Sequence, residues 1–239
     1  MIRSLLCFAV VACYCSNSYS QKTVAEPATN PDLPNVLLIG DSISMGYTNP
    51  VRKKMVGMAN VFRPKTNCGP TTKGVEELEK WLGDRKWHVI HFNHGLHDLK
   101  YMGPNNENLA DPKDATSHQQ VPPAEYASNL KKIAERLKKT GAVVVWCETT
   151  PVPEGAKGRV VGDSKKYNKI AAKVMKDLGD IEINPLWQVS TDGIPTRPEN
   201  VHYTREGSDK LADQVVAAIK KHLPKRPVSP SPIKVLSGE

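Results

Sequence analysis

Short apolar segments alternate with amphipathic segments along most of this chain. The first apolar segment, Asn35 to Ile39, is rich in aliphatic residues without polar alternation. Such a run is typical of a strand that is buried on both faces of a parallel sheet. Similar segments follow at His88 to Phe92, Ala142 to Trp146 and Ile181 to Asn184, with a weaker one at Asn60 to Phe62.

Three of the amphipathic segments have apolar residues at helical spacing. Pro122 to Lys139 places Tyr126, Leu130, Ile133 and Leu137 on one face, and Gly141 ends the pattern. Tyr167 to Leu178 and Arg205 to His222 repeat the spacing. The alternation predicts an α/β fold, a three-layer α/β/α sandwich around a parallel sheet of about five strands. Ligands then bind beyond the carboxyl ends of the strands.

The two ends of the chain depart from this pattern. Residues 1–20 contain Arg3, an apolar run from Leu5 to Ala12 and small residues before Gln21, which predicts a signal peptide and an exported, periplasmic or extracellular protein. The run is shorter than the roughly 20 residues of a spanning helix, so no membrane span is expected. Val10-Val11-Ala12-Cys13 resembles a bacterial lipoprotein processing site, so a lipid-anchored form is the minor alternative. Residues 21–34 form a predicted linker, 35–223 the domain and 224–239 a flexible Pro- and Ser-rich tail.

Charge and cysteine content narrow the classes of partner. The formal net charge is +8 and becomes +7 without Arg3 (8 − 1). No zinc-finger spacing or RNA-binding pattern accompanies the lysines, so nucleic-acid binding is not expected, and attraction to an anionic polysaccharide is at most suggested. Without the leader, Cys68 and Cys147 remain of five cysteines, either free or paired.

A serine follows the first predicted strand, within Gly40 to Gly46. Ser42 there would lie at the carboxyl edge of the sheet, where the positive end of the next helix favours developing negative charge. The alternative is a serine that only caps that helix.

A histidine and an acid lie in a loop before the last predicted helix. Glu199 and His202 are three residues apart. With Ser42 they would form a nucleophile, base and orienting acid. A lone loop histidine is more often a surface or helix-capping residue, which is the alternative for His202, and Asp192 is a reserve candidate for the acid.

These motifs, taken together, resemble the SGNH (GDSL-like) hydrolases. Gly40-Asp41-Ser42 resembles the first block of that family, Asn67-Cys68-Gly69 the second, Gly95-Leu96-His97-Asp98 the third, and Glu199 to His202 the last. The blocks occur in the family's order and span nearly the whole predicted domain. The resemblance implies strand order 2-1-3-4-5 and an oxyanion hole formed by Ser42, Gly69 and His97.

The sequence departs from the family pattern at two positions. His97 stands where the family has an asparagine, and its imidazole N–H could donate to the oxyanion or serve a structural role instead. Glu199 stands where the family has an aspartate, whose side chain is one methylene shorter.

Two further sets of side chains need an interpretation: regularly spaced histidines, which could bind a metal, and two cysteines, which could form a disulfide. His88, His91, His94 and His97 recur every third residue, but residues three apart on a strand point to opposite faces, so no metal site is expected. The implied strand order separates Cys68 from Cys147 by three strand spacings, roughly 14 Å, which exceeds the roughly 7 Å limit of a disulfide and predicts two free thiols.

The expected function is that of an exported serine esterase. It would hydrolyse carboxylic esters through an acyl-enzyme without a cofactor, and its substrate would be an acylated glycan that it deacetylates. Two alternatives remain: a carbohydrate-binding protein on a catalytically weakened scaffold, and an acyltransferase. The glycan, the acyl group and the oligomeric state are not determined by the sequence.

Overall fold

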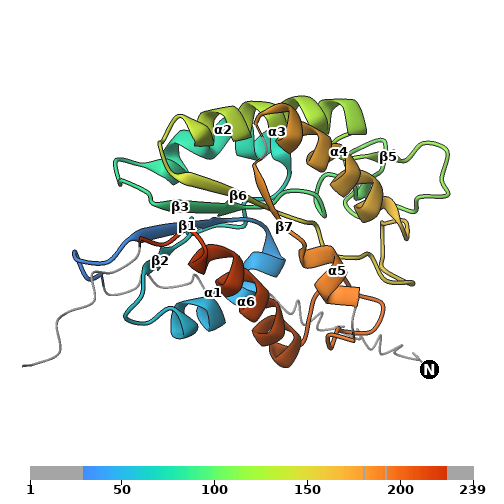
Figure 1. The fold of residues 1–239 in the computed structure, drawn as a ribbon. Coiled ribbons are helices and arrows are strands. Elements are labelled where there is room, and N and C mark those ends of the chain that lie inside the picture. Colours follow the sequence, from blue (N-terminus) through green and yellow to red (C-terminus); the bar gives the residue numbers. More distant parts are fainter. Residues whose placement is uncertain (1–28, 180, 192, 225–239) are drawn as a thin grey trace, which may run out of the picture.

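The computed structural model describes residues 29–179, 181–191 and 193–224 (Figure 1). The predicted signal peptide, Asp192 and nearly all of the predicted tail lie outside these residues. None of the described helices is both long enough and apolar enough to cross a membrane.

A five-stranded parallel sheet forms the centre of the molecule (Figure 1). Its strands lie in the order β2-β1-β3-β6-β7, and Leu37 of β1 pairs with Phe62 on one side and Ile90 on the other. The strands are β1 (Asn35–Ile39), β2 (Asn60–Phe62), β3 (Val89–Phe92), β6 (Val143–Cys147) and β7 (Glu182–Asn184). The α/β fold and the strand order expected from the sequence are therefore confirmed, and all five predicted strands are present within one residue of their predicted bounds.

The loop after β3 carries a second, smaller sheet. It consists of the antiparallel pair β4 (Tyr101–Met102) and β5 (His118–Gln119). The sequence pattern did not predict these two-residue strands, because such short segments have no readable alternation.

Helices cover both faces of the large sheet (Figure 1). One face carries α1 (Ser42–Lys54), α5 (Leu186–Thr191) and α6 (Arg205–Lys220). The other carries α2 (Thr71–Leu82), α3 (Pro123–Lys138) and α4 (Asp163–Asp177). The three helices predicted from apolar spacing correspond to α3, α4 and α6.

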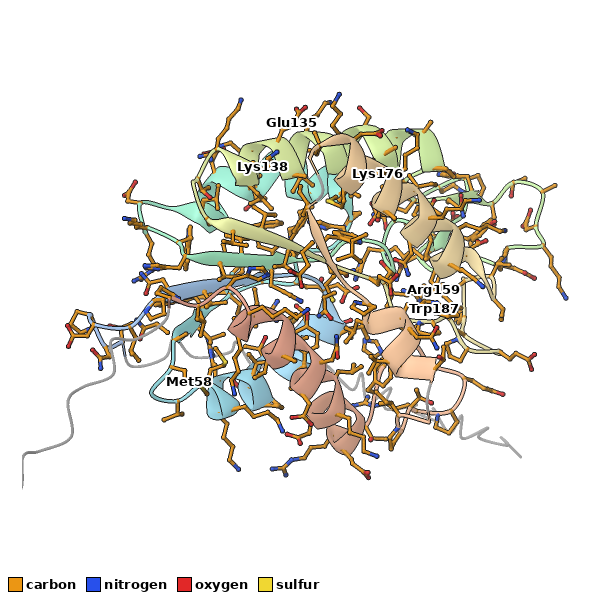
Figure 2. The ribbon with its side chains drawn as sticks, viewed as in Figure 1. Met58, Glu135, Lys138, Arg159, Lys176 and Trp187 are labelled. Carbon is orange, nitrogen blue, oxygen red and sulfur yellow. The ribbon has the colours of Figure 1, made fainter. Side chains whose placement is uncertain are left out.

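Side chains fill the space between the sheet and both helical layers (Figure 2). Phe92 and Trp146 meet edge to face with ring centroids 5.1 Å apart, and Tyr126 of α3 packs on Tyr167 of α4 at 4.8 Å. Gly46 lets α1 approach α6, since a Cβ at this position would lie 3.1 Å from Oγ of Ser208. This packing fixes the strand ends that carry the candidate site.

Two sequence-based expectations concern segments away from the site. Cys68 and Cys147 are both free and buried, so the prediction of two free thiols is confirmed. The described end of the predicted linker lies on the domain, because Nδ2 of Asn60 donates to the carbonyl oxygens of Asn30 at 2.8 Å and Leu33 at 3.1 Å.

Candidate active site

Ser42 begins helix α1 directly beyond the end of β1. Asp41 caps the helix, and its Oδ1 accepts the N–H of Ile43 at 2.9 Å. The turn from strand to helix is tight enough that a Cβ at Gly40 would lie 2.8 Å from Cβ of Ser44. Ser42 thus lies where the unpaired N–H groups of a helix N-terminus favour negative charge.

His202 lies in the loop between α5 and α6. The loop is held by the N–H of Thr204, which donates to the carbonyl of Pro195 at 3.1 Å, and by the N–H of Arg197, which donates to the carbonyl of His202 at 3.0 Å. Nε2 of His202 lies 2.8 Å from Oγ of Ser42. The structure therefore brings together the serine and the histidine that the sequence analysis paired, 160 residues apart in the chain.

Asn200 orients the imidazole of His202. Its Oδ1 lies 2.6 Å from Nδ1 of His202 and accepts the backbone N–H of His202 at 3.0 Å. A backbone N–H can only donate, so the atom it meets is the amide oxygen, and Nδ1 must carry the proton. Nε2 is then the free lone pair facing Ser42, which is the tautomer a general base requires.

Glu199, the predicted orienting acid, points elsewhere. Its backbone has a positive φ of 51°, and its side chain packs over Gly155, where a Cβ would lie 2.6 Å from Cγ of Glu199. Within the described residues, Nδ1 of His202 is bonded to Asn200 and not to Glu199. The structure thus gives the orienting position to Asn200, and the reserve candidate Asp192 lies outside the described residues.

The three predicted oxyanion donors differ in the contacts that they make within the protein. The N–H of Ser42 has no acceptor within the described chain, whereas the N–H of Gly69 donates to Oδ1 of Asn67 at 2.9 Å. His97 lines the same cavity as Ser42 and Asn67. Burial, with repulsion from Lys100 and Arg159 added to it, lowers the pKa of His97 to about 4. A neutral imidazole can still donate through its one N–H.

Buried polar side chains hold the loops around the site. The carbonyl of Gly69 faces Nδ1 of His94 at 3.0 Å, so this nitrogen carries the proton. Asp98 accepts the N–H and the hydroxyl of Thr71 at 2.7 and 2.6 Å, and burial raises its pKa to about 7. Asn93 bridges the ends of β3 and β6 by donating to the carbonyl of Cys147 at 2.8 Å.

The four regularly spaced histidines lie in four different environments. Nδ1 of His88 accepts the N–H of Asn35 at 2.9 Å, and Nε2 of His91 lies 3.0 Å from Nδ2 of Asn184. His94 faces the carbonyl of Gly69, and His97 lines the cavity. Across the described part of the chain, no three His, Cys, Asp or Glu side chains gather as metal ligands would.

A cavity of about 310 Å³ opens at the Ser42–His202 pair. It is lined by Ser42, Asn67, His97, Lys100, Asn108, Leu109, Ala156, Lys157, Arg159, Glu199, Asn200, Val201 and His202. In Figure 2, Arg159 lies beyond the carboxyl ends of the strands, on the side of α5. Three lining side chains are cationic and one is anionic, so the cavity favours negative charge.

The surroundings of His202 make its imidazole a weak base. Burial lowers its pKa from the ordinary value of 6.5, and repulsion by Arg197 and Arg159 adds to this, while Asp41 opposes it. The imidazole is therefore neutral at pH 7, as a general base must be before it takes the proton of a serine.

Several residues of the site were not predicted from the sequence, among them Asn67 and Asn200. The signal available for Asn200 was its place two residues before a candidate base, where an Asx turn brings the side chain back to the following N–H. For Asn67 the signal was its place in the second block, where the prediction considered only the glycine.

Comparison with solved structures identifies the fold. The chain matches an acetyl xylan esterase with 16% identity and a TM-score of 0.62 over 77% of this chain and 99% of that one. It also matches a lipase/acylhydrolase from Enterococcus faecalis (18%, TM-score 0.63, 81% and 99%) and a psychrotrophic esterase from Pseudoalteromonas sp. (12%, TM-score 0.56, 78% and 97%).

Comparisons of sequence add nothing to this. No family model matches the chain, and no curated protein matches it.

A GDSL-like lipase from Bacteroides thetaiotaomicron is also among the structural matches, with 17% identity and a TM-score of 0.55 over 83% of this chain and 92% of that one. The chain thus has the fold of the SGNH and GDSL-like esterases and acylhydrolases.

Proposed function

We propose that this protein is a serine ester hydrolase of the SGNH (GDSL-like) family. The observation that carries the proposal is the 2.8 Å contact between Oγ of Ser42 and Nε2 of His202. The orientation of His202 by Asn200 and the shared fold of several esterases support it. Neither an organic cofactor nor a metal is needed for this chemistry.

The proposed reaction proceeds through an acyl-enzyme. Nε2 of His202 takes the proton of the Ser42 hydroxyl as Oγ attacks the ester carbonyl, and the resulting imidazolium then gives this proton to the departing alcohol. Water attacks the acyl-enzyme in the second half, again losing its proton to Nε2, and the acid leaves as Oγ of Ser42 regains a proton.

Two groups serve as oxyanion donors in this proposal. The N–H of Ser42 is free in the described chain, and His97 lines the cavity beside it. The N–H of Gly69 becomes a third donor only when it exchanges Oδ1 of Asn67 for the substrate oxygen. Each such donor is worth about 3 kcal/mol in acyl transfer.

The proposed substrate is an acylated carbohydrate with a small acyl group. A cavity of about 310 Å³ is at the low end of ligand sites and has little room for a long acyl chain beside a sugar. One protein of the same fold is an acetyl xylan esterase. The N-terminal sequence pattern, which favours export, fits a substrate outside the cytoplasm.

Release of p-nitrophenol from its acetate ester tests the proposal. The wild-type protein is expected to hydrolyse this ester, and Ser42→Ala and His202→Ala are each expected to lose 10³-fold or more in kcat. Ser128→Ala, on the exposed side of α3, is a matched control that should keep the wild-type rate. Equal rates for wild type and Ser42→Ala would contradict the proposal and leave a binding protein on this scaffold.

A further inference from the structure

Two cationic side chains near Ser42 are withdrawn from water, one almost completely and one partly, and neither forms an ion pair within the described residues. Lys100 and Arg159 line the same cavity as Ser42 and His202. From their burial and their contacts we infer that the substrate carries an anionic group next to the scissile ester, which these two residues bind. The inference rests on the proposed esterase activity and specifies its substrate class.

Lys100 is almost completely buried. Its exposed fraction is 8%, and the partner of its Nζ is Oδ1 of Asn108 at 2.7 Å. No ion pair joins it to a carboxylate within the described residues. A buried ammonium with one neutral acceptor has two further donors to satisfy.

Arg159 is half-buried and is held in place by backbone carbonyls. Its Nε donates to the carbonyl of Leu96 at 3.1 Å, and Nη1 donates to the carbonyl of Lys157 at 3.5 Å. These contacts fix the guanidinium without neutralising it, and Nη2 has no acceptor in the described chain. A preorganised guanidinium of this kind binds carboxylate and sulfate groups through two parallel hydrogen bonds.

The two cations lie close enough to repel one another. Burial lowers the pKa of Lys100, repulsion by Arg159 adds to this effect, and attraction by Asp98 opposes it. Other cations of the chain do have carboxylate partners: Lys54 contacts Asp209 and Asp213, and Arg136 contacts Glu79. Two like charges in a cavity without a counter-charge cost free energy, and a bound ligand of opposite charge removes this cost.

Asp98 attracts Lys100 and Asp41 attracts Arg159, but within the described residues neither acid forms an ion pair with these cations. Asp98 is bonded to Thr71, and its pKa of about 7 leaves it partly protonated at neutral pH. Asp41 caps α1 through its Oδ1, and Glu199 packs over Gly155 at the cavity wall. The missing negative charge is therefore best supplied by the substrate, and the carboxylate of an acetylated uronic-acid residue fits an esterase acting on acidic glycans.

The test compares two acetyl esters that differ in one group. The substrates are the methyl glycosides of galacturonic acid and of galactose, acetylated at the same hydroxyl, and the readout is the ratio of their kcat/KM values. We expect the wild-type protein to prefer the uronate about tenfold or more, the size of one charge-assisted hydrogen bond. A galactoside carrying a sulfate at C6 is the third substrate and tells a sulfate-specific from a carboxylate-specific subsite.

Variants assign the preference to the two cations. Lys100→Met and Arg159→Gln are each expected to bring the ratio close to one, and Arg159→Lys to keep part of it. Lys132→Gln removes the same charge from the exposed face of α3 and should leave the ratio unchanged. A wild-type ratio near one for both anionic substrates, or a preference that survives Lys100→Met and Arg159→Gln, would overturn the inference.

This design separates the inference from the proposed function. Ser42-dependent hydrolysis of the neutral galactoside at the same rate as the uronate and the sulfated galactoside supports the esterase and overturns the anionic subsite. If no ester is hydrolysed, the esterase proposal fails, and calorimetric binding of unacetylated methyl galacturonide to the wild-type protein decides the subsite. Binding that Lys100→Met abolishes supports the subsite, and absence of binding overturns it.

Discussion

At the scale of single residues, the main feature of the site is that a neutral amide orients His202, the proposed base. Oδ1 of Asn200 accepts both Nδ1–H and the backbone N–H of His202. It therefore selects the tautomer of His202 as a carboxylate would, but it adds no negative charge to stabilise the imidazolium that forms during catalysis. Orientation and charge stabilisation, which one aspartate supplies in many serine hydrolases, are separated here.

Substitutions at Asn200 measure these two contributions. Asn200→Ala removes the orientation and should lower kcat about a hundredfold or more. Asn200→Asp keeps the acceptor and adds charge, so it should raise the pKa of His202 by about one unit and raise kcat up to about tenfold above that pKa. Steady-state rates on p-nitrophenyl acetate between pH 5 and 9 provide both values.

The same assay decides between Asn200 and Glu199. If Asn200 orients the base, Asn200→Ala should cost far more activity than Glu199→Gln. The opposite order would return the role to Glu199, in agreement with the expectation from the sequence.

The pH dependence of activity follows from the charges around His202. Burial, Arg197 and Arg159 lower its pKa below 6.5. The base works only when neutral, so the acidic limb of kcat/KM should lie below pH 6.5 and activity should fall as the pH drops through it. Arg197→Gln removes one repulsive charge and should move this limb to higher pH by about a few tenths of a unit. A limb above pH 6.5 in the wild-type protein would contradict this account.

At the scale of structural elements, the loop from Gly193 to Thr204 determines whether the site forms. Thr204 donates both its backbone N–H, at 3.1 Å, and its hydroxyl, at 3.3 Å, to the carbonyl of Pro195. Thr204 also caps α6 by accepting the N–H of Gly207 at 3.0 Å. The position of His202 is therefore tied to the first turn of α6.

A methyl group at Gly207 should displace this loop. The Cβ of Gly207→Ala would lie 2.1 Å from the carbonyl oxygen of Pro195, a backbone atom that cannot rotate away. Misplacement of His202 by about 1 Å should lower kcat about a hundredfold, with a loss of about 1–3 kcal/mol in the free energy of unfolding. Kinetics and denaturant melts measure both.

Gly46→Ala is the matched control for this substitution. It also places a methyl group in a helix, but its nearest neighbour is the Oγ of Ser208 at 3.1 Å, which can change rotamer. Its activity should stay within about threefold of wild type, because the Ser208 side chain can turn aside without any movement of the backbone. An equal loss of activity in both variants would argue against a special role for Gly207.

The elements of this fold could largely be predicted from apolar pattern, and the details of the loops could not. Continuous aliphatic runs such as Asn35–Ile39 leave few alternatives to a buried parallel strand. Glu199 shows the limit: its φ of 51° is uncommon for a residue other than glycine. This backbone turn directs Glu199 toward Gly155 and brings Asn200 to the imidazole, and residue spacing alone does not reveal it.

At the scale of the whole molecule, the site is a product of chain topology. Ser42, Lys100, Arg159 and His202 come from four separate segments, the first residue of α1 and three loops, and they meet because the parallel strands end at one edge of the sheet. Sequence reasoning located Ser42 and His202 because each lies in a motif. It did not locate Lys100 and Arg159, since neither is distinguishable from the many surface cations of a chain with net charge +8.

The function also depends on where the chain is delivered, and here the N-terminal sequence makes the last prediction. A charged start, a short apolar run and small residues before Gln21 predict cleavage after Ser20. Mass spectrometry of protein expressed with its full N-terminus should therefore find a mature chain that begins at Gln21, in the exported fraction. A lipid-modified chain that begins at Cys13 would indicate the anchored alternative instead. An uncleaved chain retained in the cytoplasm would contradict both, and with them the argument that the substrate is an extracytoplasmic glycan.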